Sequence, residues 1–174
     1  MVDTKLLAGI PLFRGLSTVE LEEIASHLTE RKGVPQECII KEGDPPGHPI
    51  FVLMRGAVEV LKGGVDGREH VISSLAAPSV FGEIEVLAKR PAIASVVATT
   101  NVELAMLKRG VFDEMAQQDR TAVLKIIKNL AQTLSYRLAA TDERLASYFD
   151  VGDTTMRERL GLVRTVLYSS WKAD

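Results

Sequence analysis

The chain has 174 residues, of which 46% are hydrophobic and 25% charged, a balance typical of a soluble globular protein. This length suits one domain with at most one appended element. The formal net charge of −2 shows no basic excess of the kind that nucleic-acid binders carry, so we expect no specific binding to duplex DNA.

The N-terminal residues MVDTKLLAG lack the basic and apolar regions of a secretory signal. No apolar run approaches the roughly 18 to 20 residues that span a bilayer. We therefore expect a cytoplasmic protein without membrane contact. The single cysteine, Cys38, excludes an intramolecular disulfide and reads as a small apolar side chain in a strand.

No catalytic constellation is found in the sequence. The histidines, His27, His48 and His70, are too scattered for a zinc or iron site. Nucleophile elbows, HExxH sequences and Walker loops are absent. We expect no enzyme activity and no metal.

The first helix is predicted near Ser17, which can cap it, with Glu20 completing a capping box. Apolar residues then recur at helical spacing and predict one buried face: Leu21, Ile24, Ala25 and Leu28.

From about Val34 to Leu107 the pattern changes to short apolar runs separated by Gly, Pro and Asp, which predicts strands and turns. The Asp66-Gly67 pair predicts a hairpin, and Gly56 a bulge or tight crossing. Many short strands favour a small antiparallel barrel or jelly roll. The predicted strands are Cys38–Ile40, Ile50–Met54, Ala57–Leu61, Val71–Ile72, Ala94–Ala98 and Val102–Leu107.

A short helix is predicted near Val111–Ala116 and a long one over about Arg120–Tyr148. The long helix carries a heptad seam, which favours a homodimer formed through Leu124, Ile127, Leu134, Leu138 and Leu145. A second stripe could pack on the barrel: Val123, Ile126 and Leu130. The alternative is a single wide face packed within the monomer. The predicted divisions are a β domain with its N-terminal helix at 1–117, the long helix at 118–149 and a short amphipathic tail at 150–174.

One stretch, FGEIEVLAKRPAIASVVA over 81–98, carries a family resemblance. With Pro-Leu-Phe-Arg-Gly-Leu-Ser at 11–17, Glu-Gly-Asp at 42–44 and the long helix, it resembles the cyclic nucleotide-binding domain of the cyclic AMP receptor and fumarate-nitrate regulator superfamily, over roughly residues 10–149. The resemblance implies a mainly β fold with flanking helices: a β-roll (a jelly roll, or double-stranded β-helix) followed by a long dimerisation helix. It also implies cyclic AMP, cyclic GMP or another small anion as the candidate ligand.

The resemblance further implies a ligand site in which Gly82 lets the backbone approach the phosphate and Glu83 accepts from the ribose 2′-hydroxyl. Ser95 would contact the phosphate through its hydroxyl and Ala94 through its backbone, while Thr141 would meet the base or only set the helix register. The full implied set is Phe81, Gly82, Glu83, Ile84, Ala92, Ala94, Ser95 and Thr141.

Ala92 is the departure from the family motif, because the arginine that grips the phosphate stands at this position in the family. A charge-assisted hydrogen bond contributes about 1.5 to 3 kcal/mol, so its loss weakens binding roughly ten- to a thousandfold. Glu85 replaces a residue that is usually small and apolar, and adds repulsion near the anion. Arg90 is a candidate substitute, but Pro91 stiffens the chain beside it.

Three functions remain in competition at this point. The first is a non-catalytic sensor whose helices signal to an unidentified downstream protein, and the second is an interaction module that kept the roll and dimer helix without a ligand. The third, a metal-dependent enzyme on a jelly roll, lacks its ligand cluster. The family's DNA-binding transcription factors need roughly 70 further residues for a helix-turn-helix, which reinforces the expectation of no DNA binding.

Overall fold

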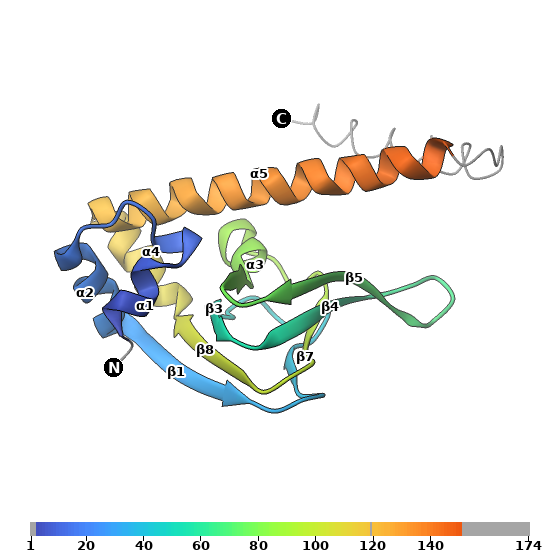
Figure 1. Ribbon diagram of the computed structural model, residues 1–174, viewed down its shortest axis with the longest axis horizontal. Coiled ribbons are helices and arrows are strands. Elements are labelled where there is room, and N and C mark those ends of the chain that lie inside the picture. The colour runs from blue at the N-terminus through green and yellow to red at the C-terminus, as the bar shows by residue number, and fades with distance from the viewer. Residues whose placement is uncertain (1–2, 119, 151–174) are drawn as a thin grey trace. The chain divides into compact units, whose positions relative to one another are not determined.

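The computed structural model describes residues 3–118 and 120–150, and the predicted tail at 150–174 lies outside the described residues beyond Asp150. The chain divides into two compact units, with the boundary between Leu130 and Ala131 inside the long helix. The first unit holds all the strands described below (Figure 1).

The N-terminal segment forms α1 (Thr4–Ala8), a 3-10 turn (Pro11–Phe13) and α2 (Thr18–His27). The predicted capping box at the start of α2 is confirmed: the Ser17 N–H donates to Glu20 Oε2 at 2.6 Å, and the Glu20 N–H donates to Ser17 Oγ at 3.3 Å. These bonds satisfy amide groups that a helix start leaves without partners. They fix where α2 begins.

Two four-stranded antiparallel sheets form the β-roll. One sheet has the order β1-β8-β3-β6 and the other β2-β7-β4-β5, so strands distant in sequence lie side by side (Figure 1). The mainly β fold with flanking helices is thereby confirmed. The strands are β1 (Leu28–Gly33), β2 (Cys38–Ile40), β3 (Ile50–Arg55), β4 (Ala57–Gly63), β5 (Glu69–Ala76), β6 (Ser79–Phe81), β7 (Ser95–Ala98) and β8 (Val102–Leu107).

The prediction that the β region begins near Val34 was wrong, because β1 already starts at Leu28. Half of the residues of this strand are charged, and it is held by its ladder to β8 from Leu28 opposite Leu107 to Gly33 opposite Val102. Cys38 also differs from expectation, since it is exposed at the start of β2. Backbone pairing, rather than apolar alternation, places β1 in the roll.

Gly56 lies where β3 turns into β4, at φ 89°. A Cβ atom there would approach the Asn101 carbonyl oxygen to 2.3 Å, and the β3–β8 register shifts at Leu53 and Arg55. The predicted tight crossing is confirmed. The β4–β5 hairpin turns at Gly67, whose φ of 75° suits glycine.

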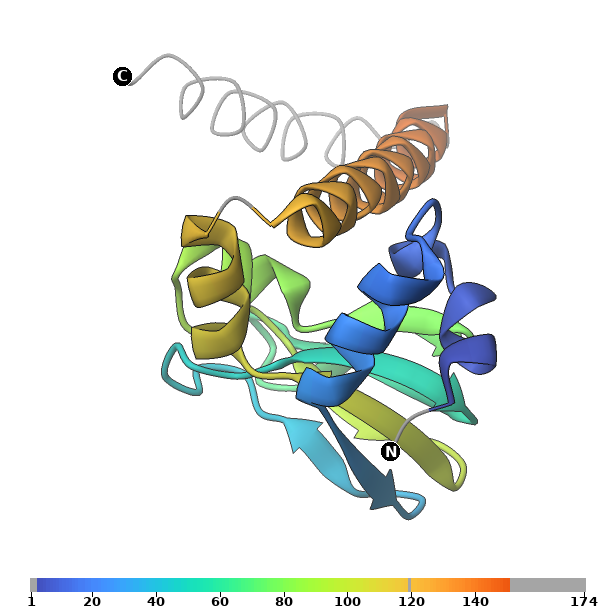
Figure 2. The ribbon, with the colours of Figure 1, turned by 90° about the vertical axis from the view of Figure 1, so that its left-hand side faces the viewer.

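Two apolar clusters hold the first unit together. Side chains of the two sheets form the inner cluster, which includes Phe51, Leu53 and Leu104. The outer cluster lies where α1, α2 and α4 (Arg109–Gln117) gather at one end of the roll, the end that faces the viewer in Figure 2.

The long helix α5 runs over Thr121–Asp150. Its stripe of Val123, Ile126 and Leu130 is buried in the outer cluster, at 0% to 1% exposure, as predicted. On the predicted seam, Leu124 is 57% and Leu138 63% exposed.

Candidate functional site

The Phe-Gly-Glu motif opens the short helix α3 (Glu83–Ala88). Gly82 caps it in the left-handed region at φ 77°, where a Cβ atom would lie 2.9 Å from the Pro49 carbonyl oxygen and 3.2 Å from Phe51 Cδ2. The Phe81 ring stacks on Phe51 with centroids 5.0 Å apart. Glycine is therefore required here by the fold itself.

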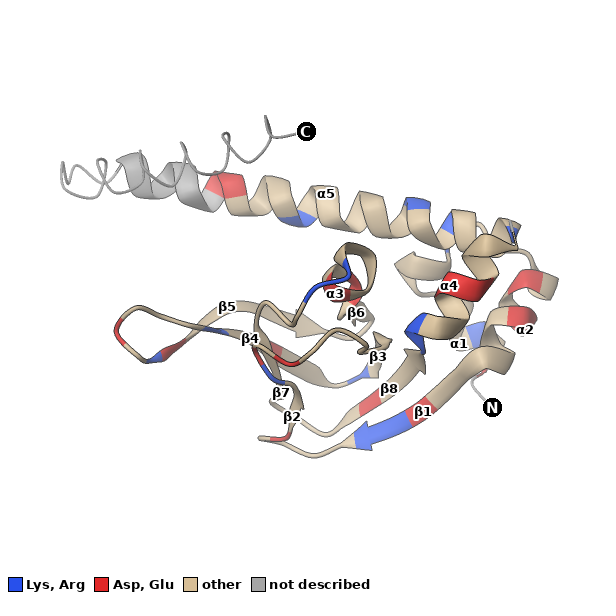
Figure 3. Cartoon of the chain, turned by 180° about the vertical axis from the view of Figure 1, so that it is seen from behind, with Lys and Arg blue, Asp and Glu red and all other residues tan. Residues whose placement is uncertain are grey.

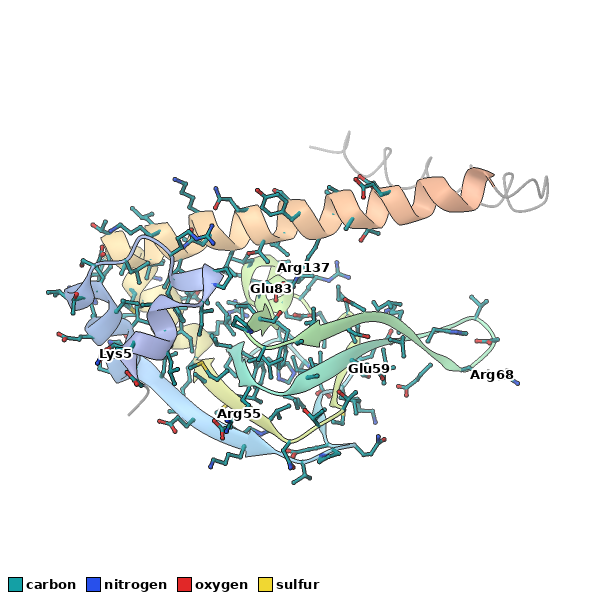
Figure 4. The ribbon with its side chains drawn as sticks, viewed as in Figure 1. Lys5, Arg55, Glu59, Arg68, Glu83 and Arg137 are labelled. Atoms are coloured by element: carbon teal, nitrogen blue, oxygen red, sulfur yellow. The ribbon has the colours of Figure 1, made fainter. Side chains whose placement is uncertain are left out.

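Two buried carboxylates occupy the first turn of α3. Glu83 is 1% exposed and Glu85 is 7% exposed (Figure 4 labels Glu83). The backbone N–H of Ile93 donates to Glu85 Oε1 at 3.1 Å. A side chain from the helix thus binds the loop that precedes β7.

That loop also holds Ala92, which is 4% exposed and belongs to the inner cluster of the roll. Its N–H donates to the Asp44 carbonyl at 2.9 Å, and its carbonyl accepts from the Gly43 N–H at 2.8 Å. Ser95, 4% exposed, accepts through Oγ from the Glu42 N–H at 3.0 Å. Both positions are fixed by bonds to the segment after β2.

Glu42 and Lys62 complete the support of this loop. Lys62 Nζ donates to Glu42 Oε1 and to the Ile93 carbonyl, and the Gly63 N–H donates to Glu42 Oε2 at 2.9 Å. The Gly63 N–H and then Lys62 lower the pKa of Glu42 below its ordinary value. Sequence analysis missed the role of this pair. Glu42 follows β2 and Lys62 lies at the end of β4, and the two are brought together only because both strands pair with β7.

The segment after α3 is basic, and Lys89 and Arg90 are both exposed (Figure 3). Within the described residues the Arg90 side chain makes no hydrogen bond or ion pair.

Seven of the eight residues implied by the family motif lie in the first unit, around α3 and the loop before β7: Phe81, Gly82, Glu83, Ile84, Ala92, Ala94 and Ser95. Thr141 lies on α5 in the second unit, where it is exposed and its Oγ1 donates to the Arg137 carbonyl at 2.9 Å. The first unit therefore brings these seven residues together without Thr141.

A cavity of about 580 Å³ opens elsewhere on the first unit. It includes Lys108 and Arg109 at the start of α4 and Thr29 of β1, and none of its lining residues belongs to the motif. Residues 3–118 and 120–150 contain no cluster of His, Cys, Asp and Glu that could hold a metal ion. No helix in the described part of the chain is long and apolar enough to cross a membrane.

The family model described as the cyclic nucleotide-binding domain matches residues 30–119, just over half of the chain. Among curated proteins, the cAMP-dependent protein kinase regulatory subunit of Colletotrichum orbiculare is 38% identical over 109 residues, which are 63% of this chain and 27% of that subunit. The chain therefore spans about a quarter of the length of this relative.

Solved structures share the fold. Thermus thermophilus catabolite activator protein aligns with a TM-score of 0.68 and 27% identity, covering 79% of this chain and 62% of that one. A variant of the regulatory subunit of a cAMP-independent protein kinase A from Trypanosoma brucei aligns with a TM-score of 0.65 and 27% identity, covering 74% and 44%. That variant, with a glutamate replaced by alanine, a threonine by arginine and a valine by alanine, is bound to cyclic AMP.

Proposed function

Because the chain belongs to the cyclic nucleotide-binding domain family, we propose that it is a non-catalytic regulatory module whose binding of cyclic nucleotide is weakened or altered, and that it signals through a helix-mediated homodimer. The similar proteins named above are regulatory subunits and an activator protein, which supports the regulatory role.

The observation that carries the altered ligand is Ala92. The backbone at this position is fixed on both sides, by Asp44 and Gly43, and its side chain lies in the inner cluster of the roll. A motif arginine here would project its guanidinium from the same backbone position, but the methyl group of alanine offers no charge. An alanine at this position therefore supplies no cation for a phosphate, which supports a weakened or altered site.

The cyclic AMP-bound variant from Trypanosoma brucei supports this proposal. Its second and third substituted positions lie seven and eight residues after the first, and the second introduces an arginine. Glu85, Ala92 and Ile93 have the same spacing in this chain. On this spacing Glu85 corresponds to the position that the variant changed to alanine, and Ala92 to the position that it changed to arginine; we take this correspondence as support for the proposal.

The homodimer rests on the exposed part of the α5 seam. Leu138 exposes 63% of its surface, and Leu124 exposes 57%. Exposed apolar side chains on one face of a helix favour association, because burial removes them from water. Two subunits joined in this way would give the module a route to an unidentified downstream protein.

Calorimetric titration with cyclic AMP and cyclic GMP tests the proposal. We expect weak binding by the unmodified protein, and binding stronger by roughly tenfold to a thousandfold when Ala92→Arg is combined with Glu85→Ala. Tight binding by the unmodified protein would overturn the weakened site. No binding by either form, with circular dichroism showing an intact fold, would favour the alternative of a ligand-free interaction module.

A further inference from the structure

The cavity at the start of α4 lies outside the family motif. It has a volume of about 580 Å³, and its walls come from β1, β8, the segment before β3 and the first residues of α4. Thr29 of β1 and Met106 of β8 are opposite one another in the antiparallel ladder, so both strands contribute to one wall. Volumes of roughly 300 to 1,000 Å³ are typical of sites for small molecules. The cavity therefore has room for a ligand larger than a simple ion.

Two cationic side chains line this cavity, Lys108 and Arg109, at the junction of β8 and α4 that is blue in Figure 3. Arg109 is held by Asp113, whose Oδ2 accepts from Arg109 Nε at 3.4 Å, and its side chain is only 20% exposed. Within residues 3–118 and 120–150, the two terminal guanidinium nitrogens and Lys108 Nζ form no hydrogen bond or ion pair. One carboxylate thus faces two cations, which leaves a positive excess and unused donors for an oxyanion.

The backbone at the start of α4 adds to this positive excess. The N-cap residue, Lys108, makes no side-chain capping bond, and the first turn contains no acidic residue. The first amide groups of a helix need partners from outside the helix and carry partial positive charge. An anion bound by the two side chains would also satisfy these amide groups.

Gly110, the second residue of α4, keeps one wall of the cavity open. A Cβ atom at this position would meet no atom within 4 Å, and the φ of Gly110 is not in the left-handed region. Neither packing nor backbone conformation therefore requires a glycine here. Glycine is less favourable than alanine within a helix, and close approach of a ligand to the backbone is one reason for its presence.

We propose that this cavity binds a small organic phosphate whose apolar body lies against Pro49 and Met106. The phosphate is bound by Arg109, Lys108 and the first amide groups of α4. A phosphate suits this arrangement because its three terminal oxygens can accept from three separate groups of donors, whereas a carboxylate has two oxygens. None of the lining residues belongs to the family motif, so the inference does not depend on the proposed function.

The test is a titration of the full chain with phenyl phosphate, followed through the amide signals of Thr29, Gly47 and Gly110 in two-dimensional NMR. We expect these signals to shift with a dissociation constant of about 1 mM or below. Inorganic phosphate, which lacks the apolar body, and benzyl alcohol, which lacks the charge, should each bind at least about tenfold more weakly. Benzoate should bind more weakly than phenyl phosphate, because it offers one oxygen fewer.

Three variants separate charge from space. Arg109→Gln and Lys108→Gln should each raise the dissociation constant of phenyl phosphate at least about threefold. Gly110→Leu keeps both cations but fills the open space, and should raise it at least about tenfold without lowering the unfolding temperature, because leucine is the better helix former. Lys32→Gln is the matched control: it removes an exposed cation of β1 outside the cavity and should change the constant by less than about twofold.

Four outcomes would overturn the inference. Shifts at Gly82 and Ala94 in place of the cavity signals would assign the phosphate to the family motif. Equal binding of phenyl phosphate and inorganic phosphate would show that no apolar body is held. An effect of Lys32→Gln as large as that of Lys108→Gln would indicate attraction by surface charge in general. Absence of any shift would exclude the site, while the cyclic nucleotide titration would still test the proposed function separately.

Discussion

The two stretches of α5, 121–130 and 131–143, carry the same three-and-four spacing of apolar residues but meet different surroundings. In the first stretch Val123, Ile126 and Leu130 are buried in the outer cluster. In the second, Leu138 is 63% and Tyr136 78% exposed. Periodicity predicts the helix equally well in both stretches. Which side chains are covered depends on the elements packed around each one.

The largest expected effect on stability comes from truncating a buried apolar side chain of the first stretch. Leu130→Ala should lower the free energy of unfolding by about 2 to 5 kcal/mol, because it leaves a cavity in the outer cluster, where Leu130 is 1% exposed. The same truncation at the exposed Leu138 should change it by less than about 0.5 kcal/mol. Urea denaturation at low protein concentration measures both, and equal losses would contradict the contrast.

Charging the exposed stretch should act on association instead. Leu134→Lys with Leu138→Lys should raise the dissociation constant of the proposed dimer at least about a hundredfold, or about 3 kcal/mol, since unpaired charges are costly to bury. Sedimentation velocity measures the shift. The pair Gln132→Lys and Ala140→Lys adds the same charge at exposed positions off the seam and should leave the dimer intact. A monomeric unmodified protein at micromolar concentration would contradict the homodimer.

A smaller effect is expected at Asn129, which joins the first stretch to the N-terminal segment. Its Nδ2 donates to the carbonyls of Leu12 at 2.8 Å and of Arg14 at 2.9 Å, and the residue is buried. Asn129→Ala leaves these carbonyls without that donor and should cost about 1 to 3 kcal/mol in thermal unfolding. Gln132→Ala, exposed on the same helix, is the control and should cost almost nothing.

The smallest effect concerns the ion pair between Lys125 and Glu20, at 2.8 Å. Lys125, and then the Ser17 N–H, lower the pKa of Glu20 below its ordinary value of 4.5. A lowered pKa adds stability above pH 4.5, and this is lost as the pH falls through the folded-state value. The contribution should stay below about 1 kcal/mol, because the Lys125 side chain is 37% exposed.

Unfolding in urea at pH 7 and at pH 3 checks this prediction. Glu20→Gln should remove part of the difference between the two conditions, because glutamine keeps the capping bond to Ser17 but carries no charge to titrate. A variant that loses as much stability on acidification as the unmodified protein would show that other carboxylates account for the change.

The sequence was sufficient for elements whose signal is local. The capping box of α2 and the strands with apolar runs, such as β3 and β8, were predicted from residues within each segment. The strand β1, LTERKG, was missed because only its ends are buried and its position comes from pairing with β8. The sequence of a charged strand shows little of the register in which it pairs with a strand distant in the chain.

The candidate site likewise combines features that are visible in the sequence with contacts that only the folded chain shows. The absence of an arginine at position 92 is visible in the sequence, and so is the unusual Glu85. That the Glu85 carboxylate binds the Ile93 N–H follows only once α3 and the loop before β7 are folded together. The pairing of Lys62 with Glu42 also needs β2 and β4 to pair with the same strand, β7. The spacing of residues along the sequence does not predict contacts between side chains of separate turns.

The conformation of Gly82 bears on how a binding motif should be understood. Any other residue there would be strained at φ 77° and would press its Cβ against the Pro49 carbonyl, whether or not a ligand is present. Ser95 similarly receives the Glu42 N–H inside the protein. The fold alone requires Gly82, and Ser95 has a bonding partner within the protein, so both residues can persist in a chain whose ligand has changed. A match to such a motif therefore indicates common ancestry and a shared fold. Only the motif residues that the fold does not require can indicate which ligand is bound.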